Sequence, residues 1–462
     1  MHQKLVKHLI FPVHEKVIGR KTFDYLEELE RLQWASASEL GELQFQKVKA
    51  LLIHAGKNIP FYAKRFRDAG FDPAKMQNIE DFKVLPMLTK KEIRENLQGM
   101  TWCDCPGGLQ RYNTGGSSGE PLIFYFDRRR QAYDAAARAL THRWWGIDVG
   151  DKEVYLWGSP LEITKQDRIK DFRDRLTNQL LLSAFELSPT QLRSYVERMK
   201  RFRPKCLFGY PSSIDLFCRM ARQHGYDLSR LGIQAVFSTA EVLYDHQKEN
   251  ISATLGGISV VNGYGSREAG FISHECPSGA MHVIDPNVIV EYVRDGHPVG
   301  PGEDGEVVVT HLDNWAMPFI RYRTGDVAQF DDKLCTCGRH LSIIKKIQGR
   351  TTDFVVTPDG RWQHALSLIY VVRDIPGVVQ FKIIQEAVDN VRVLLEVDKN
   401  LFPEDGNSLI VEGFKKRMGK DVDVSVEIAD EIAKDASGKY RYVVSKVAES
   451  DLLGRGVTRA KE

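Results

Sequence analysis

Between residues 150 and 265, short apolar runs alternate with amphipathic segments, and this alternation restricts the possible folds more than any other feature of the sequence. The runs lie at 154–157, 206–208, 233–237 and 258–261, and helix-like stretches follow the second and the third of them. Short buried strands that alternate with helices form βαβ units, in which the strands are parallel. The pattern therefore predicts an α/β fold built on a parallel sheet.

Each of these runs ends in a cluster of small or polar residues. The clusters are 158–160, 209–212, 238–241 and 262–265. Because loops and helix N-termini meet at the carboxyl ends of parallel strands, ligands bind there. We therefore expect the active site along this line of clusters.

The segments on either side predict further structure. Residues 1–100 show helical periodicity with many charges, 283–347 are rich in strand patterns, and the chain beyond 349 alternates strands and helices in a unit of roughly 100 residues. The predicted fold is a large multi-layer N-terminal domain, 1–349, with a parallel βαβ sheet and a β-rich subdomain. A small mobile C-terminal α+β domain, 350–462, follows it.

Composition excludes several classes of protein. Of 462 residues, 42% are hydrophobic and 27% charged, which is typical of globular proteins and not of disordered or low-complexity chains. Lys and Arg number 64 against 62 Asp and Glu, so no basic field favours a nucleic-acid partner. No apolar run reaches the roughly 18 residues of a membrane span, and seven cysteines lack a disulfide framework. We expect a soluble cytoplasmic protein.

The segment 114–121 carries the strongest local signal. Three glycines let backbone amides approach an anion closely, and three hydroxyl groups add hydrogen-bond donors. A mononucleotide P-loop would end in Gly-Lys followed by Ser or Thr, and this segment has no Lys. We therefore expect a polyphosphate-binding loop that needs a cation from elsewhere in the chain.

Five motifs together indicate a family: 114–121, 262–268, 322–326, 349–350 and 437–441. In order and spacing they resemble the AMP-forming acyl-adenylate ligases over about residues 80–445, and most of all the phenylacetate–CoA ligase branch with its capsule-biosynthesis relatives. The resemblance implies a two-step reaction. A small-molecule carboxylate attacks ATP with Mg²⁺ present and releases pyrophosphate, and a thiol such as CoA then takes the acyl group and releases AMP. The resemblance also allows a homodimer.

The resemblance assigns roles to individual residues. Lys439 resembles the adenylation lysine of the small domain, and Glu268 resembles the magnesium-binding carboxylate. Arg267 replaces the family's hydroxyl residue, so it is expected either to act as a cation near phosphate or to hold a polar acyl group. The ATP-binding positions implied are Thr114, Gly115, Gly116, Ser117, Ser118, Gly119, Glu241, Asn262, Gly263, Tyr264, Gly265, Ser266, Asp326 and Arg350. The acyl-pocket candidates are Trp157, Tyr210, Thr239 and Ala240.

Within the ATP set, Tyr264 resembles the aromatic residue that stacks on adenine, Asn262 a partner of the base edge, and Asp326 the carboxylate that accepts the ribose hydroxyls. One departure concerns the hinge: Thr352 stands where the family has an acid, and Asp353 follows it. An amide ligase or adenylyltransferase that does not use CoA therefore stays open, as does a nucleotide-binding protein without catalysis. The sequence does not identify the carboxylate.

A second group of residues indicates a metal. Cys276 and His282 flank a Pro- and Gly-containing turn, and Cys335 and Cys337 form a tight Cys-x-Cys-Gly turn further on. Three thiolates and one imidazole suit a closed tetrahedral zinc site, which serves structure and not catalysis. Isolated thiols are the alternative, and His274 is a second candidate for the imidazole.

Overall fold

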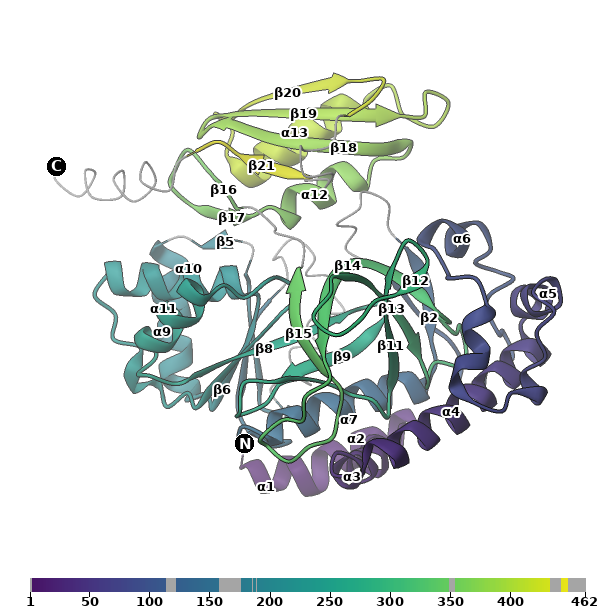
Figure 1. Cartoon of the computed structure of the whole chain (residues 1–462). Helices are drawn as coiled ribbons and strands as arrows, with labels where there is room; N and C mark the ends of the chain where they lie inside the picture. Colours follow the sequence, from purple (N-terminus) through teal and green to yellow (C-terminus); the bar gives the residue numbers. More distant parts are fainter. Residues whose placement is uncertain are drawn as a thin grey trace, which may run out of the picture.

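The computed structural model describes residues 2–113, 122–157, 176–184, 186–187, 189–348, 354–432 and 442–447. A sheet with the strand order β12-β11-β13-β14-β15-β10-β9-β8-β7-β6-β3-β4 runs through the large part of the chain (Figure 1). Its parallel half consists of β3 (Glu153–Leu156), β4 (Gln179–Leu182), β6 (Cys206–Gly209), β7 (Ala235–Thr239) and β8 (Ser259–Ser266). The predicted parallel sheet is confirmed, and β4 extends it by a strand that was not predicted.

Helices α9 (Pro189–Phe202), α10 (Pro211–Gln223) and α11 (Asp245–Thr254) pack on this parallel half. Leu192, Val196, Ile214 and Ile251 are buried in one apolar cluster with the strand residues Val154 and Leu207. The amphipathic stretches between the strands therefore bury their apolar faces against the sheet, as βαβ units require.

The other half of the sheet is antiparallel. Its strands are β9 (Gly270–Glu275), β10 (Met281–Val283), β11 (Val288–Arg294), β12 (His297–Pro298), β13 (Gly305–His311), β14 (Tyr322–Asp331) and β15 (Ile343–Gln348). The predicted β-rich region is confirmed with one shift: the strand expected at 319–322 begins only at Tyr322. The buried residue before it, Arg321, has a left-handed backbone (φ 51°), which is incompatible with a continuing strand.

The N-terminal helices lie along one side of this sheet (Figure 1). They are α1 (Gln3–Leu5), the π-helical turn η1 (Val6–Ile10), α2 (Phe11–Ile18), α3 (Thr22–Leu32), α4 (Ala37–Asn58), α5 (Pro60–Asp68) and α6 (Lys90–Glu95), with the 3₁₀ turns η2 (Pro73–Lys75) and η3 (Ile79–Val84). The hairpin of β1 (Gln110–Asn113) and β2 (Ile123–Phe126) leads into α7 (Arg128–Arg143), which packs between α3 and β9. No helix in the described part of the chain has the length and apolar character of a membrane span.

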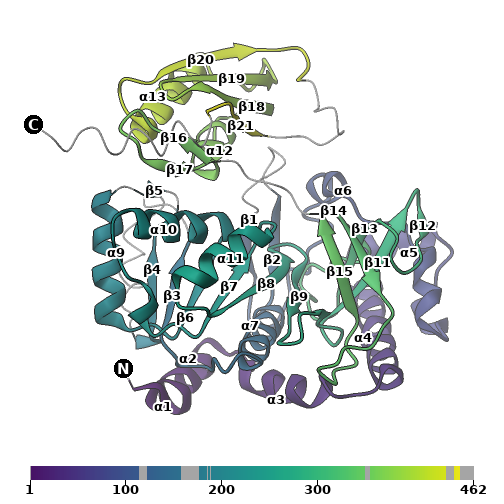
Figure 2. The same cartoon turned by 60° about the vertical axis from the view of Figure 1, so that its left-hand side comes forward.

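The last part of the chain forms its own sheet and core (Figure 2). A sheet with the order β20-β19-β18-β21 carries α12 and α13 and buries Phe381, Val393 and Phe414. The bounds are β16 (Phe354–Val356), β17 (Trp362–His364), α12 (Leu366–Arg373), β18 (Val378–Ala387), β19 (Asn390–Val397), α13 (Gly406–Met418), β20 (Asp423–Ile428) and β21 (Val443–Ser445). Strand β17 also pairs with β5 (Glu186–Leu187) from the preceding part of the chain. The fold class predicted from the sequence is the one observed.

Candidate active site

The carboxyl ends of β6, β7 and β8 lie side by side. Gly209 is in register with Ser238, and Ser238 with Asn262. Three of the four clusters that were expected to meet, 209–212, 238–241 and 262–265, therefore lie at one edge of the sheet. The fourth, 158–160, is outside the described residues.

At this edge, Trp157 and Tyr210 stack on each other, with ring centroids 4.1 Å apart. Tyr210 is buried and Trp157 half-buried. Thr239 is the last residue of the neighbouring strand β7, and Ala240 directly follows it. The next residue, Glu241, accepts two hydrogen bonds from Ser212. One comes from the Ser212 backbone N–H, at 3.3 Å, and the other from the Ser212 hydroxyl group. All four acyl-pocket candidates and Glu241 thus lie on adjacent strand ends.

Two residues expected at the adenosine are in contact. The Tyr264 hydroxyl donates a hydrogen bond to Asp326 Oδ2 at 3.1 Å. Burial, with Asp326 alongside, raises the pKa of Tyr264 well above its usual value, so the hydroxyl stays protonated and can donate. Their strands, β8 and β14, are separated in the sheet by β9, β10 and β15, so the sheet curls to bring them together.

Asn262 lies in the middle of β8, two residues before Tyr264. Its backbone N–H donates to Glu275 Oε2 at 2.9 Å, and Lys248 Nζ lies 2.7 Å from the other oxygen of that carboxylate. The Asn262 side chain is half-buried. The strand end is therefore anchored through its backbone, and the amide side chain is not used in that anchor.

The Glu268 carboxylate lies in the turn between β8 and β9 and is buried. The Tyr322 hydroxyl donates to its Oε1 at 3.2 Å, and Lys90 Nζ lies 3.7 Å from the same oxygen. Lys90 is the first residue of α6, which begins at a capping box of Thr89 and Glu92. This lysine was not predicted. The capping box is a sequence signal for the start of a helix, but no residue near Lys90 in the sequence indicates that it contacts Glu268.

Arg267 is exposed, and its Nη1 donates to the backbone oxygen of Asn113 at 3.2 Å. Asn113 is the last residue of β1 and directly precedes the segment 114–121. Of the predicted ATP-site and catalytic residues, Thr114, Gly115, Gly116, Ser117, Ser118, Gly119, Arg350 and Lys439 lie outside the described residues. The others, from Glu241 to Asp326, lie along the edge just described.

The four predicted metal ligands come together away from this edge. The donor atoms of Cys276, His282, Cys335 and Cys337 all lie within 4.8 Å of one another, with 3.7 Å between the sulfurs of Cys276 and Cys335. Zn–S bonds of about 2.3 Å in a tetrahedron place two sulfurs about 3.8 Å apart, so this spacing fits zinc. His282 Nε2 lies 3.2 Å from Cys337 Sγ.

The second nitrogen of the His282 ring is also held. His282 Nδ1 lies 3.1 Å from the oxygen of Leu341, to which it donates, and this leaves the Nε2 lone pair directed at the thiols. His274, the alternative imidazole, contacts instead the oxygen of Glu275 at 3.3 Å and is not part of the group.

Comparisons with known proteins show which proteins the chain resembles. The family model of the CapK C-terminal domain matches residues 355–446. The CapK protein of Staphylococcus aureus is 26% identical over 438 residues, which cover 93% of this chain and 94% of the relative. The phenylacetate–coenzyme A ligase of Escherichia coli strain K12 is 26% identical over 71% of this chain and 75% of its own. The chain is therefore similar to CapK over nearly its whole length and to the phenylacetate–CoA ligases over most of it.

The crystal structure of a 2-hydroxyisobutyryl-CoA ligase, in its postadenylation state with 2-HIB-AMP, superposes on the chain with a TM-score of 0.59. The two share 18% sequence identity, and the superposition covers 92% of this chain and 93% of that one. This likeness shows a shared fold. The resemblance that the five motifs indicated and the predicted fold class are both confirmed.

Proposed function

We propose that this protein activates a small carboxylic acid with ATP, releasing pyrophosphate, and then transfers the acyl group from the adenylate to a thiol, in the first instance CoA. The observation that carries the proposal is the pairing of Tyr264 with Asp326 and of Glu268 with Lys90 at the carboxyl edge of the sheet. Homology to the phenylacetate–CoA ligases supports the reaction type.

In this proposal, Tyr264 and Asp326 bind the adenosine. Attack of a carboxylate on a polyphosphate needs positive charge around the phosphates. Lys90 supplies the cation that the segment 114–121 lacks, and Arg267 stands beside the start of that segment. The buried Glu268 carboxylate is a hard oxygen ligand suited to hold Mg²⁺, which neutralises phosphate charge when bound. The carboxylate substrate is placed against Trp157 and Tyr210.

Lys439 is proposed as the adenylation lysine, carried by a separate C-terminal domain of residues 350–462. Replacing a group that contacts only the transition state costs about 3–4 kcal/mol, or on the order of a few hundredfold in rate. Lys439→Ala should therefore abolish adenylation and still convert a synthetic acyl-adenylate and CoA to thioester. Equal loss of both half-reactions would contradict this role.

The test of the whole proposal is ATP–pyrophosphate exchange over a panel of aryl, fatty and amino acids, followed by AMP release with CoA. Carboxylate-dependent exchange together with CoA-dependent AMP release supports the thiol ligase. Carboxylate-dependent exchange without any CoA-dependent release of AMP supports the second candidate, an amide ligase or adenylyltransferase. That candidate is kept because one relative, matched over 93% of the chain, is CapK, whose name states no acceptor.

We also propose a structural zinc ion bound by Cys276, His282, Cys335 and Cys337. Four protein ligands leave no open position, so the ion would join the turn after β9 to the turn before β15 and take no part in catalysis. Elemental analysis should find one zinc per chain, and a value well below one in freshly purified protein would exclude the site. Free thiol ligands accord with a reducing cytoplasm, where we place the protein.

A further inference from the structure

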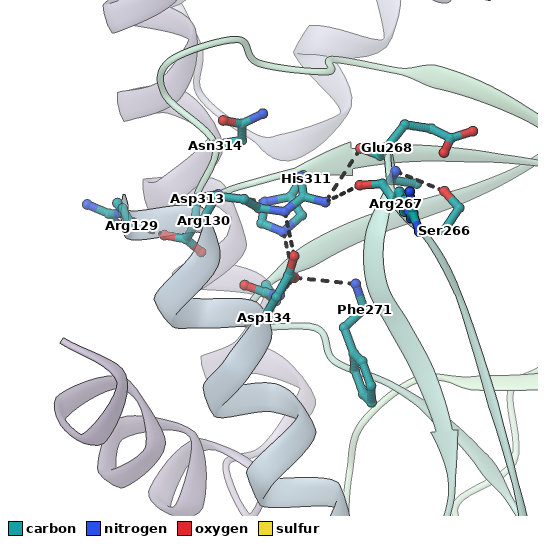
Figure 3. A network of polar contacts seen from close by, with 12 residues as sticks. Arg129, Arg130, Asp134, Ser266, Arg267, Glu268, Phe271, His311, Asp313 and Asn314 are labelled. Atoms are coloured by element: carbon teal, nitrogen blue, oxygen red, sulfur yellow. Dashed lines mark hydrogen bonds and ion pairs between the residues drawn. The ribbon is translucent and has the colours of Figure 1, made fainter. Parts of the chain in front are cut away.

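Behind the turn that carries Glu268 lies a buried arginine. Arg130, on helix α7, is fully buried, and its Nε donates to Asp134 Oδ2 at 2.7 Å. Its Nη2 faces the backbone oxygens of Arg267, at 3.4 Å, and of Glu268, at 3.5 Å (Figure 3). These two contacts are at the long end for hydrogen bonds, so their attraction is mainly that of a buried cation for two carbonyl dipoles.

The partner of this arginine is itself held on several sides. Asp134 Oδ1 lies 3.3 Å from His311 Nε2 and accepts the backbone N–H of Phe271 at 3.3 Å (Figure 3). His311 Nδ1 accepts the backbone N–H of Asp313 at 3.1 Å, so the ring proton is on Nε2 and is donated to Asp134. The carboxylate is thus fixed from β9 and β13, and it fixes the guanidinium in turn.

The turn between β8 and β9 packs directly against the side chains of Arg130 and His311. Gly270 has a left-handed backbone (φ 97°), and a Cβ atom there would lie 2.7 Å from His311 Cδ2 and 2.8 Å from Arg130 Nη2. The backbone therefore approaches the two side chains as closely as glycine allows. Because no free space separates them, a displacement of the Arg130 or His311 side chain would also displace the backbone of the turn.

We infer that Arg130 is a positioning residue that fixes the backbone of Arg267 and Glu268 from behind. With both carbonyls drawn toward α7, the Glu268 side chain meets Lys90 and Tyr322, and the Arg267 side chain meets the end of β1. The inference rests on the proposed function only where it takes Glu268 to be the magnesium-binding carboxylate. The contacts of Arg130 with the turn do not depend on that function.

An arginine suits this position because the bonds point in two directions. Nε binds Asp134 while Nη2 faces the turn, and the planar guanidinium holds the two at a fixed angle. A lysine offers one nitrogen and can keep the ion pair or the carbonyl contacts, but not both. Arg130→Lys therefore keeps the buried charge balanced and removes the positioning.

The chain provides a matched control. Arg138 also lies on α7, is about a quarter exposed at its side chain, and binds both oxygens of Glu153, at 2.9 and 2.8 Å. Its hydrogen bonds and ion pair in the described part of the chain go to Glu153, at the start of β3, and not to the turn. Arg138→Lys weakens a comparable ion pair on the same helix at a distance from Glu268.

Two measurements on the full chain test the inference: hydrogen exchange of the amides in 264–272, and the Mg²⁺ dependence of ATP–pyrophosphate exchange. We expect Arg130→Lys to speed amide exchange there at least tenfold and to raise the half-saturating Mg²⁺ concentration at least fivefold, and Arg138→Lys to change neither. Equal behaviour of the two variants would overturn the inference.

The amide measurement needs no substrate, so it separates this inference from the proposed function. A wild-type protein without pyrophosphate exchange on any acid would count against the function, while protected amides in 264–272 that Arg130→Lys exposes would still support the positioning. Should the Arg130→Lys chain not fold, Asp134→Glu takes its place. This variant keeps the ion pair with Arg130 but displaces it by one methylene group. Faster amide exchange in 264–272 and a raised half-saturating Mg²⁺ concentration would support the inference, and no change relative to Arg138→Lys would overturn it.

Discussion

Gly270→Ala offers a quantitative test of how tightly the turn is packed against its buried network. Forcing an alanine into a left-handed backbone costs about 1–2 kcal/mol. The added methyl group would also meet His311 Cδ2 at 2.7 Å and Arg130 Nη2 at 2.8 Å, both far inside normal contact. Overpacking a well-packed interior costs about 1–3 kcal/mol more. We therefore expect a loss of about 2–5 kcal/mol in the free energy of unfolding.

The matched control is Gly296→Ala. Gly296 has a similar left-handed backbone (φ 85°), but a Cβ atom there meets nothing within 4 Å. The control therefore carries the backbone strain without the collision, and we expect it to lose only about 1–2 kcal/mol.

Urea unfolding of the two variants beside the wild type isolates the collision as the difference between them, about 1–3 kcal/mol. Gly270→Ala should also raise the half-saturating Mg²⁺ concentration, and Gly296→Ala should not. Equal stability losses in the two variants would refute the reasoning, because they would mean that Arg130 and His311 move aside freely. A network that yields to one methyl group cannot position a carboxylate.

Three further predictions follow from other sites. Burial lowers the pKa of His142 to about 4 and of His274 to about 3. Because the unfolded chain takes up these protons near pH 6.5, the two groups should together contribute a fall in stability of up to about 2.7 kcal/mol per pH unit between about pH 6.5 and pH 4, which the burial-raised pKa of Asp285, about 7, offsets in part. Urea unfolding at several pH values measures the slope, and His142→Gln should change it by up to about 1.4 kcal/mol per pH unit in the direction of greater stability at low pH; an unchanged slope would contradict the assignment. Cys337→Ser should lose bound zinc in elemental analysis while Cys103→Ser retains it, and retention in both would exclude the proposed ligand set. Tyr264→Phe keeps the ring and loses a hydroxyl hydrogen bond, so ATP binding measured by calorimetry should weaken by about tenfold or less; a complete loss would show that the hydroxyl does more than hold its partner.

Much of the fold was predictable because its signals are local. Strands β3, β6 and β7 are short apolar runs that end in Gly, Pro or polar residues, and each was expected within two residues of its observed bounds. Strand β8 was expected to end at residue 261 but continues to Ser266, because residues 262–266 pair with β9 beyond the apolar run. Strand β9 was missed because its six residues, Gly270–Glu275, mix small, aromatic and charged side chains without strict alternation. The Cys and His group was predictable for the same local reason, since each pair of ligands sits in its own short turn.

The contacts that complete the site were not predictable, because they join distant parts of the chain. Lys90 reads in the sequence as an ordinary residue at a helix start, and nothing in its neighbourhood indicates Glu268. Arg130 ends a run of three arginines, and the sequence does not distinguish them. The side chain of its neighbour Arg129 is 38% exposed, whereas that of Arg130 is completely buried. Sequence spacing could give the residue types but not this difference in burial.

The position of the candidate magnesium-binding carboxylate is therefore set from the side of the turn that faces away from the ligand. Only glycine fits at the base of the turn, because a Cβ atom on Gly265 would lie 2.4 Å from the oxygen of Gly270. Within the turn, the Ser266 hydroxyl oxygen accepts the backbone N–H of Ala269 at 3.0 Å, and helix α7 adds contacts from outside through Arg130. A buried ion pair contributes little net stability, since desolvation offsets most of the attraction between the charges. Apolar residues in place of both Arg130 and Asp134 would serve stability as well, but they would attract neither carbonyl. The positioning of Glu268, and not the stability of the fold, is what an arginine at this place provides.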